Sequence, residues 1–169
     1  MILRKHDLLL QDSRARDDGT DVDAMELCFE LLSLAGAIDR DCAARLRPHR
    51  LSEGKFVILS LLRDRPRGLP PHELADGAGV TRATITGLID GLERDGLLRR
   101  VPDKADRRSI SVRLTPQGAA LAADLGGAHT AWIATLTGDL TMEERKMLRK
   151  LLRRIWMRTD AGRAAEPVS

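Results

Sequence analysis

Residues 71–96 read PHELADGAGVTRATITGLIDGLERDG, and this stretch decides how the rest of the chain is interpreted. Two apolar patterns with helical spacing lie on either side of the turn-forming sequence GAGV. Pro71 suits the first turn of one helix, and Thr81 suits the N-cap of the next. Gly96 suits the position just beyond a helix end. The stretch therefore predicts a short helix, a tight turn and a longer helix.

The longer predicted helix has one apolar face and one polar face. Its apolar residues recur at positions i, i+3, i+4 and i+7, namely Ile85, Leu88, Ile89 and Leu92. The free face carries Arg82, Thr84 and Thr86. Arginine can bond guanine through two N–H groups, and threonine offers both a hydroxyl and a methyl group. We expect this face to enter a DNA major groove, the alternative being that the threonines are ordinary exposed helix residues.

Two short strands follow, at residues 97–101 (LLRRV) and 109–114 (SISVRL), and a charged loop joins them. Residues 99–113 hold six basic and two acidic side chains, and Arg107 and Arg108 are at the predicted tip. Guanidinium groups suit the negative potential of a narrow minor groove. Asp106 would orient one of these arginines, unless the loop is only a solvated acid–base cluster. Helix, turn, helix and hairpin together predict a winged helix-turn-helix domain over residues 51–115.

The segments outside this domain predict further helices with unpartnered apolar faces. One long helix runs from about residue 22 to residue 46, and a helix rich in alanine covers residues 117–136. Thr141 and Glu144 match a capping box before a last amphipathic helix. We expect residues 22–50 and 116–158 to form a helical dimerisation region, with flexible ends at residues 1–21 and 159–169. The expected fold class is mainly α with a small β-hairpin.

Composition excludes several classes of protein. No apolar run in the 169 residues approaches the roughly 18 that cross a membrane, and the N-terminus does not resemble an export signal. With only two cysteines, the chain is expected to be cytoplasmic. It shows neither a glycine-rich phosphate loop nor a nucleophile elbow, and His72-Glu73 lacks the second histidine of a zinc motif. We expect no enzyme activity, no cofactor and no metal site.

The chain resembles the MarR family of bacterial transcription regulators over roughly residues 22–158. The most specific match is Asp106-Arg107-Arg108-Ser109, followed by Leu114-Thr115 and Gly118, which is similar to the wing signature of that family. The helix pair also resembles the family in register. This resemblance implies a homodimeric regulator, expected to be a repressor, that binds double-stranded DNA at a pseudo-palindromic operator. Gly87 stands where many members carry a larger, often basic residue.

The resemblance also implies control by a small molecule, often a phenolic or aromatic acid. The candidate residues for holding its carboxylate follow the long first helix, namely Arg45, Arg47, His49 and Arg50. The alternative is ordinary surface charge that complements the helix dipole.

Residues 26–31 (ELCFEL) resemble the reactive-cysteine segment of a hydroperoxide-sensing branch of the family, with Cys28 in the matching place. That branch uses tyrosines to activate its cysteine, and this chain has none. Cys28 lies on the apolar stripe of its predicted helix, so we expect it to be buried and structural. Release by a ligand is the expected mechanism. The two alternatives are peroxide sensing and ligand-independent architectural DNA binding.

Overall fold

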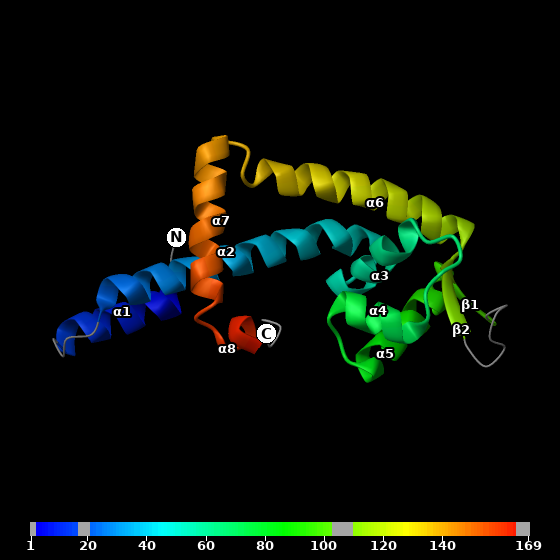
Figure 1. Ribbon diagram of the computed structural model, residues 1–169, viewed down its shortest axis with the longest axis horizontal. Coiled ribbons are helices and arrows are strands. Elements are labelled where there is room, and N and C mark those ends of the chain that lie inside the picture. Colours follow the sequence, from blue (N-terminus) through cyan, green and yellow to red (C-terminus); the bar gives the residue numbers. More distant parts are fainter. Residues whose placement is uncertain (1–2, 17–20, 103–109, 165–169) are drawn as a thin grey trace. The chain divides into compact units, whose positions relative to one another are not determined.

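The computed structural model describes residues 3–16, 21–102 and 110–164 of the chain. It contains two compact units, residues 1–122 and residues 123–169. The predicted class, mainly helical with one small β-hairpin, is confirmed (Figure 1). The first unit contains α1 (Arg4–Arg16), α2 (Val22–Leu46), η1 (Arg47–His49), α3 (Glu53–Arg63), α4 (Pro71–Ala78), α5 (Arg82–Arg94), β1 (Leu98–Pro102), β2 (Ile110–Leu114) and the start of α6 (Pro116–Thr135). The second unit contains the rest of α6, α7 (Met142–Trp156) and α8 (Asp160–Ala164).

The helix-turn-helix forms as the sequence predicts, and each boundary has a local cause. Pro71 opens α4, where a missing N–H costs nothing. Gly79 ends α4 with a φ of +63°, a conformation that favours glycine. Thr81 caps α5, because its hydroxyl oxygen accepts a hydrogen bond from the backbone N–H of Thr84 at 3.2 Å. The shared core of α3, α4, α5 and the hairpin is aliphatic, and its fully buried side chains include Ile58, Leu59, Leu74, Ile85, Ile89, Leu92 and Val112.

The hairpin pairs β1 with β2 in antiparallel register, with Leu98 opposite Leu114 and Arg100 opposite Val112. Leu69, in the segment before α4, adds a third short piece of sheet on the free edge of β2. The Leu69 N–H donates to Val112 O at 3.1 Å, and the Val112 N–H donates to Leu69 O at 2.8 Å. The sequence predicts only a loop there, because RPRGLPP has the composition of a turn. The segment before α4 and the strand after α5 therefore belong to the same small sheet, which links the two ends of the helix-turn-helix.

The start of α6 is fixed against the base of the hairpin. The Thr115 hydroxyl donates to Gly96 O at 2.8 Å and accepts from the Gly118 N–H at 3.0 Å. A Cβ atom at position 118 would overlap the carbonyl oxygen of Leu97, so this close approach requires glycine. Thr115 and Gly118, which the sequence singles out, thus lock the strand-to-helix junction.

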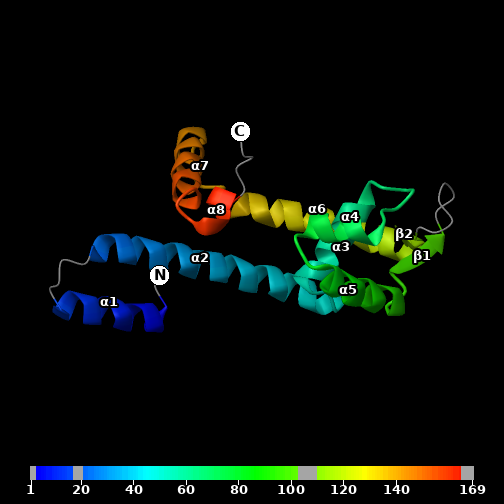
Figure 2. The same cartoon turned by 60° about the horizontal axis from the view of Figure 1, so that its bottom comes forward.

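Residues 4–16 correct a prediction, because they form a helix and not a flexible extension. Helix α1 lies antiparallel to the first half of α2 (Figures 1 and 2). Leu10 is 1% exposed, and the His6 ring stacks on Phe29 with centroids 4.4 Å apart. A short polar helix of this kind gives a weak sequence signal, since its stability comes from packing against α2.

Helix α2 matches its predicted range, but the face that carries Cys28 is not buried within the chain. Cys28 is exposed, and Cys42 is buried. Helix α1 covers the side of Phe29 and Ser33, and the Leu3 N–H donates to the Ser33 hydroxyl at 3.4 Å. The predicted burial of Cys28 is therefore wrong for the single chain, because the helix that packs on α2 covers the neighbouring face.

In the second unit, α7 begins with the predicted capping box. The Thr141 hydroxyl accepts from the Glu144 N–H, and a Glu144 carboxylate oxygen accepts from the Thr141 N–H at 2.7 Å. None of the residues of α7 is buried within the chain. The flexible tail predicted from residue 159 is wrong for Asp160–Ala164, which form α8. The division into a dimerisation region and a DNA-binding domain stays a prediction.

Candidate nucleic-acid interface

Helix α5 has the two-sided character that a groove-reading helix requires. Ile85, Ile89 and Leu92 are at most 1% exposed and face the core. Arg82, Thr84, Thr86 and Gly87 are all exposed on the other side. The structure thus exposes all three predicted α5 residues within the first turns of the helix. Arg82 and Thr86 are one turn apart and share a side, whereas Thr84 lies on the other flank of the exposed surface. Their contact with DNA stays a prediction.

The hydroxyl groups of Thr84 and Thr86 already form hydrogen bonds within the chain. Thr84 Oγ1 lies 2.9 Å from Thr81 Oγ1, so the cap and its neighbour form a hydroxyl pair. The Thr86 hydroxyl donates to the Arg82 carbonyl oxygen at 2.9 Å. Thr86 therefore presents a methyl group and acceptor lone pairs, which fit a thymine methyl or a base amino group better than a phosphate oxygen.

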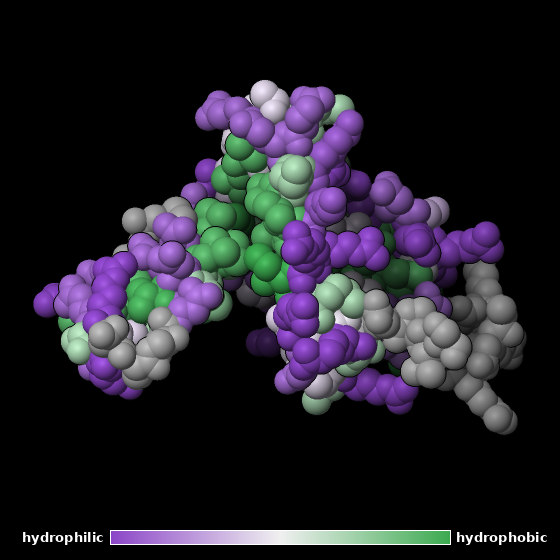
Figure 3. Space-filling view, turned by 60° about the vertical axis from the view of Figure 1, so that its left-hand side comes forward, coloured by the Kyte–Doolittle hydropathy of each residue, from purple (hydrophilic) through white to green (hydrophobic). Residues whose placement is uncertain are grey.

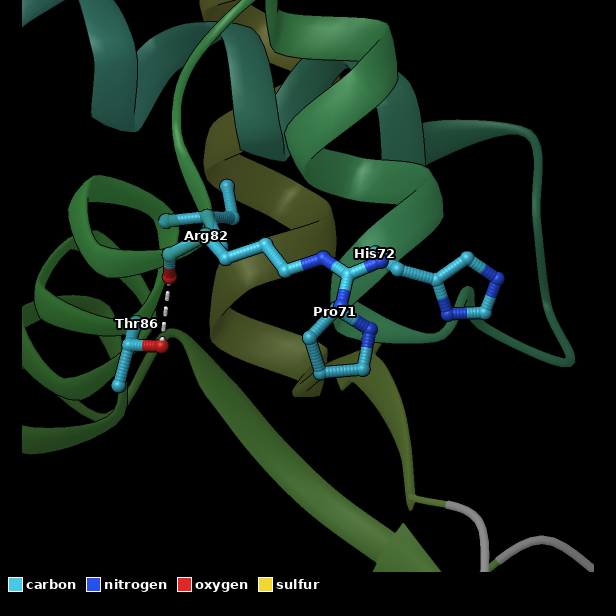
Figure 4. A pocket seen from close by; sticks show the side chains of 5 residues that line it. Pro71, His72, Arg82 and Thr86 are labelled. Atoms are coloured by element: carbon cyan, nitrogen blue, oxygen red, sulfur yellow. Dashed lines mark hydrogen bonds between the residues drawn. The ribbon is translucent and has the colours of Figure 1, made fainter.

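Arg82 lines a surface hollow of about 350 Å³ together with Pro71, His72, Ile85 and Thr86. Figure 4 shows the Arg82 side chain extending from α5 toward α4, while the His72 ring points away from it. The Arg82 guanidinium lies beside the start of α4, and the dipoles of α4 and α5 add positive potential to its charge. Sequence reasoning considered His72 only as a metal ligand. Its place beside Arg82 depends on how α4 packs against α5, which the local sequence does not reveal.

The wing is described at its base only. Asp106, Arg107 and Arg108 lie outside the described residues, and their predicted role stays a prediction. At the base, Arg99 is exposed and lies opposite Arg113 in the register. Two arginines directly opposite each other concentrate positive charge on that face of the hairpin, at some cost in repulsion.

Arg100 differs from its neighbours because carboxylates surround it. Its guanidinium donates to Asp90 Oδ1 at 2.5 Å and to Glu93 Oε2, and its backbone N–H donates to Glu93 Oε1 at 3.0 Å. The hydrogen bond that the Arg100 guanidinium donates to Asp90 is the largest cause that raises the pKa of Arg100 above its ordinary value. Of Arg99, Arg100 and Arg113, the basic residues of 99–113 that the structure describes, Arg100 is the one that forms ion pairs, and Asp90 and Glu93 neutralise its charge.

The candidate ligand residues are grouped in one turn, and all are exposed. Arg45 donates to Asp41 O at 2.9 Å, one turn back along α2. Arg47 and His49 belong to η1, and Arg50 follows with a φ of +56°, a left-handed conformation that is unusual outside glycine. The grouping matches the prediction, but their role in binding a ligand is untested.

The two cysteines have different environments. Burial is the largest cause that raises the pKa of the Cys42 thiol, and Glu53 and Asp39 add to the effect. Cys28 is exposed, and the side chains one turn away on α2 are apolar, namely Ala24, Met25, Leu31 and Leu32. Neither thiol therefore has a cation on its own helix turn to stabilise a thiolate, apart from the weak lowering effect of Arg45 on Cys42.

The residues that the structure describes also bear on metal binding and on membrane insertion. They contain no cluster of three or more histidine, cysteine or acidic side chains that could hold a metal ion. None of the helices in these residues is long and apolar enough to cross a membrane.

Comparison with known proteins decides the family. The model of the MarR family matches residues 51–110. The HTH-type transcriptional repressor YetL of Bacillus subtilis is 38% identical over 133 residues, which cover 78% of this chain and 80% of YetL. The chain belongs to the MarR family. It is a DNA-binding transcriptional regulator and not an enzyme.

Solved MarR-family structures show the same fold. The S. aureus MepR–DNA complex aligns with a TM-score of 0.66 at 21% identity, over 75% of this chain and 93% of MepR. CouR from Rhodococcus jostii RHA1, bound to p-coumaroyl-CoA, aligns with a TM-score of 0.65 at 25% identity, over 79% of this chain and 93% of CouR. The wing of this MarR-family chain also has the third piece of sheet at Leu69, which the sequence analysis missed.

Proposed function

We propose that the chain is a homodimeric repressor that binds a pseudo-palindromic operator and is released by a small, aromatic anionic ligand. The observation that carries this proposal is the free face of α5, where Arg82, Thr84 and Thr86 are exposed beside a buried apolar stripe. Such a face has the shape and chemistry to read base edges in a major groove. The name of YetL, a transcriptional repressor, supports the direction of regulation.

The apolar face of α7 supports a dimer. Six of its large apolar side chains are between 39% and 56% exposed in the single chain, namely Met147, Leu148, Leu151, Leu152, Ile155 and Trp156. Figure 3 shows apolar side chains, in green, gathered at the molecular surface. Six large apolar side chains exposed on one helix are unfavourable in water and are typical of an interface. A second copy of the chain would cover it and would present two recognition helices to two half-sites.

Charge also favours pairing between copies. Residues 145–159 contain seven basic residues and no acid, whereas residues 1–41 contain ten acidic and five basic side chains. In a dimer the basic side of α7 would find acidic partners on the N-terminal helices.

A ligand as the releasing signal is supported by CouR, whose solved structure contains p-coumaroyl-CoA. The guanidinium groups of Arg45, Arg47 and Arg50, with the N–H groups of His49, have the chemistry to hold an anion near the end of α2. An effector acts only if it binds the two conformations with different affinity.

The test begins with a DNA duplex selected from a random-sequence pool by the wild-type chain. We expect a pseudo-palindromic footprint and much tighter binding than to random DNA. Arg82→Ala and Arg108→Ala should each weaken binding by about 1–3 kcal/mol, and Arg108→Ala should give a shallower salt dependence. Arg63→Ala, a matched control at an exposed arginine paired with Asp64, should bind like wild type. Equal affinity for selected and random DNA would show an architectural binder instead.

A further inference from the structure

Arg100 connects the recognition helix to the wing through both its side chain and its backbone. Its guanidinium bonds Asp90 Oδ1 at 2.5 Å and Glu93 Oε2, while its N–H bonds Glu93 Oε1 at 3.0 Å. Asp90 and Glu93 are one turn apart on α5, so they present two carboxylates to one side. Glu93 accepts hydrogen bonds from both the backbone and the side chain of Arg100, which ties β1 to the C-terminal part of α5.

These carboxylates are unexpected on a helix that approaches DNA. Each acid lowers the attraction to phosphate, and together they outnumber the single cation that they hold. A surface ion pair with this exposure adds little to stability, since the Arg100 side chain is 29% exposed and the acids are 50% and 37% exposed. The cluster instead fixes an orientation, because a planar guanidinium that bonds two carboxylates at once can do so in few arrangements.

We propose that Arg100, held by Asp90 and Glu93, is a positioning residue that sets the angle between α5 and the wing, so that both reach their grooves together. It acts through the wing and does not itself contact DNA. Arg99 is the natural contrast, because it is adjacent in β1, exposed, and forms no ion pair with the residues that the structure describes. This inference rests on the proposed operator binding and names a further residue in it.

Removing one of the two acids changes DNA affinity in opposite directions under the two explanations, positioning of the wing and simple electrostatics. Asp90→Asn and Glu93→Gln keep the side-chain shape and remove a negative charge. If only charge mattered, both variants would bind DNA more tightly. If the cluster positions the wing, both should bind about tenfold more weakly, a size within the range measured for coupled residues. Asp76→Asn is the matched control, because Asp76 is an exposed acid of α4 without an ion pair to a described residue, and it should bind equally or more tightly.

A second arm asks whether Arg100 acts through the wing. Arg100→Ala should weaken binding to the selected duplex about tenfold in the wild-type background and less than about threefold in an Arg108→Ala background. Arg99→Ala should have an effect that is additive with Arg108→Ala. The thermal midpoint of each variant is measured alongside, and Arg100→Lys replaces Arg100→Ala if the latter fails to fold.

The outcomes distinguish a failure of the proposed operator binding from a failure of the positioning role of Arg100. If the wild-type chain selects no duplex, operator binding fails. If it selects one and Arg108→Ala weakens binding, but the Asp90 and Glu93 variants bind as tightly as wild type or more tightly, the positioning role is wrong. Additive effects of Arg100→Ala and Arg108→Ala would also overturn it, since Arg100 would then be an independent phosphate contact.

Discussion

Two glycines of this chain have opposite surroundings, although both lie in helices. A Cβ atom at Gly87, on the free face of α5, would meet nothing within 4 Å. A Cβ atom at Gly118, at the start of α6, would overlap the backbone of Leu97. The first glycine leaves open space on the exposed surface of α5, whereas the second permits a close junction.

We expect Gly87→Ala to raise the free energy of unfolding by about 0.5–1 kcal/mol, because alanine loses less backbone entropy in a helix than glycine. Gly118→Ala should lower it by about 1–3 kcal/mol, because the junction must move apart. Denaturant titration of both variants tests the pair. A stabilising Gly118→Ala would show that the contact between α6 and Leu97 is not close in solution.

Single positions show how far sequence reasoning reaches. Thr81, Pro71 and Gly96 were assigned correctly, because caps depend on a few neighbouring residues. The exposure of Cys28 was not predicted, because it depends on which face of α2 its neighbour covers. The hydrogen bonds from Arg100 to Asp90 and Glu93 were also not predicted, although the sequence places the two acids on one side of α5.

Helix α1, like the short α8, is an element that the sequence did not predict. Leu10 is its most deeply buried side chain, so its truncation tests the packing of α1 on α2. We expect Leu10→Ala to lower the free energy of unfolding by about 2–4 kcal/mol through lost burial and a cavity. Leu8→Ala, at a position that is 59% exposed, is the control and should change it far less. Equal small effects at both positions would mean that α1 is detached.

The sequence predicted the two strands of the hairpin but not the pairing of Leu69 with Val112. The strands of the hairpin were placed within one or two residues, because apolar and polar side chains alternate along them. The bridge at Leu69 pairs residues more than forty positions apart, and only the folded backbone brings them together. Long-range pairing of a single residue carries no periodic signal.

The capping box of α7 makes a prediction about pH. The hydrogen bond from the Thr141 N–H is the largest cause that lowers the pKa of Glu144. A carboxyl group whose folded pKa is depressed stabilises the helix above its unfolded pKa, and this contribution is lost as pH falls through the folded value. We therefore expect the start of α7 to fray in acid, below the ordinary titration range of glutamate. Amide hydrogen exchange at residues 142–145 should show this loss in wild type and a much weaker pH dependence in Glu144→Gln.

For the whole molecule, the open question is what turns DNA binding off. Moving a two-state equilibrium from almost fully bound to almost fully free requires a ligand that prefers one state by about 10⁴-fold. An oxidant reacts with the thiolate, so a sensing cysteine needs surroundings that stabilise the thiolate. Cys28 is accessible, but its helical neighbours are apolar and the chain contains no tyrosine. Arg47 and Arg50 give an anionic ligand the positive charge that the helical neighbours of Cys28 do not give a thiolate.

We therefore expect p-coumarate or salicylate to release the selected duplex from both wild type and Cys28→Ser, and cumene hydroperoxide to release neither. Arg50→Gln should weaken the response to the acid while leaving DNA affinity without the acid unchanged, because Arg50 lies outside the helix-turn-helix. Fluorescence anisotropy of labelled duplex measures every combination. Release of the wild type by peroxide, with Cys28→Ser spared and no response to the acids, would replace the ligand mechanism by thiol oxidation. The exposure of Cys28 makes that comparison decisive, since the oxidant can reach the sulfur and only the chemistry of its surroundings is being tested.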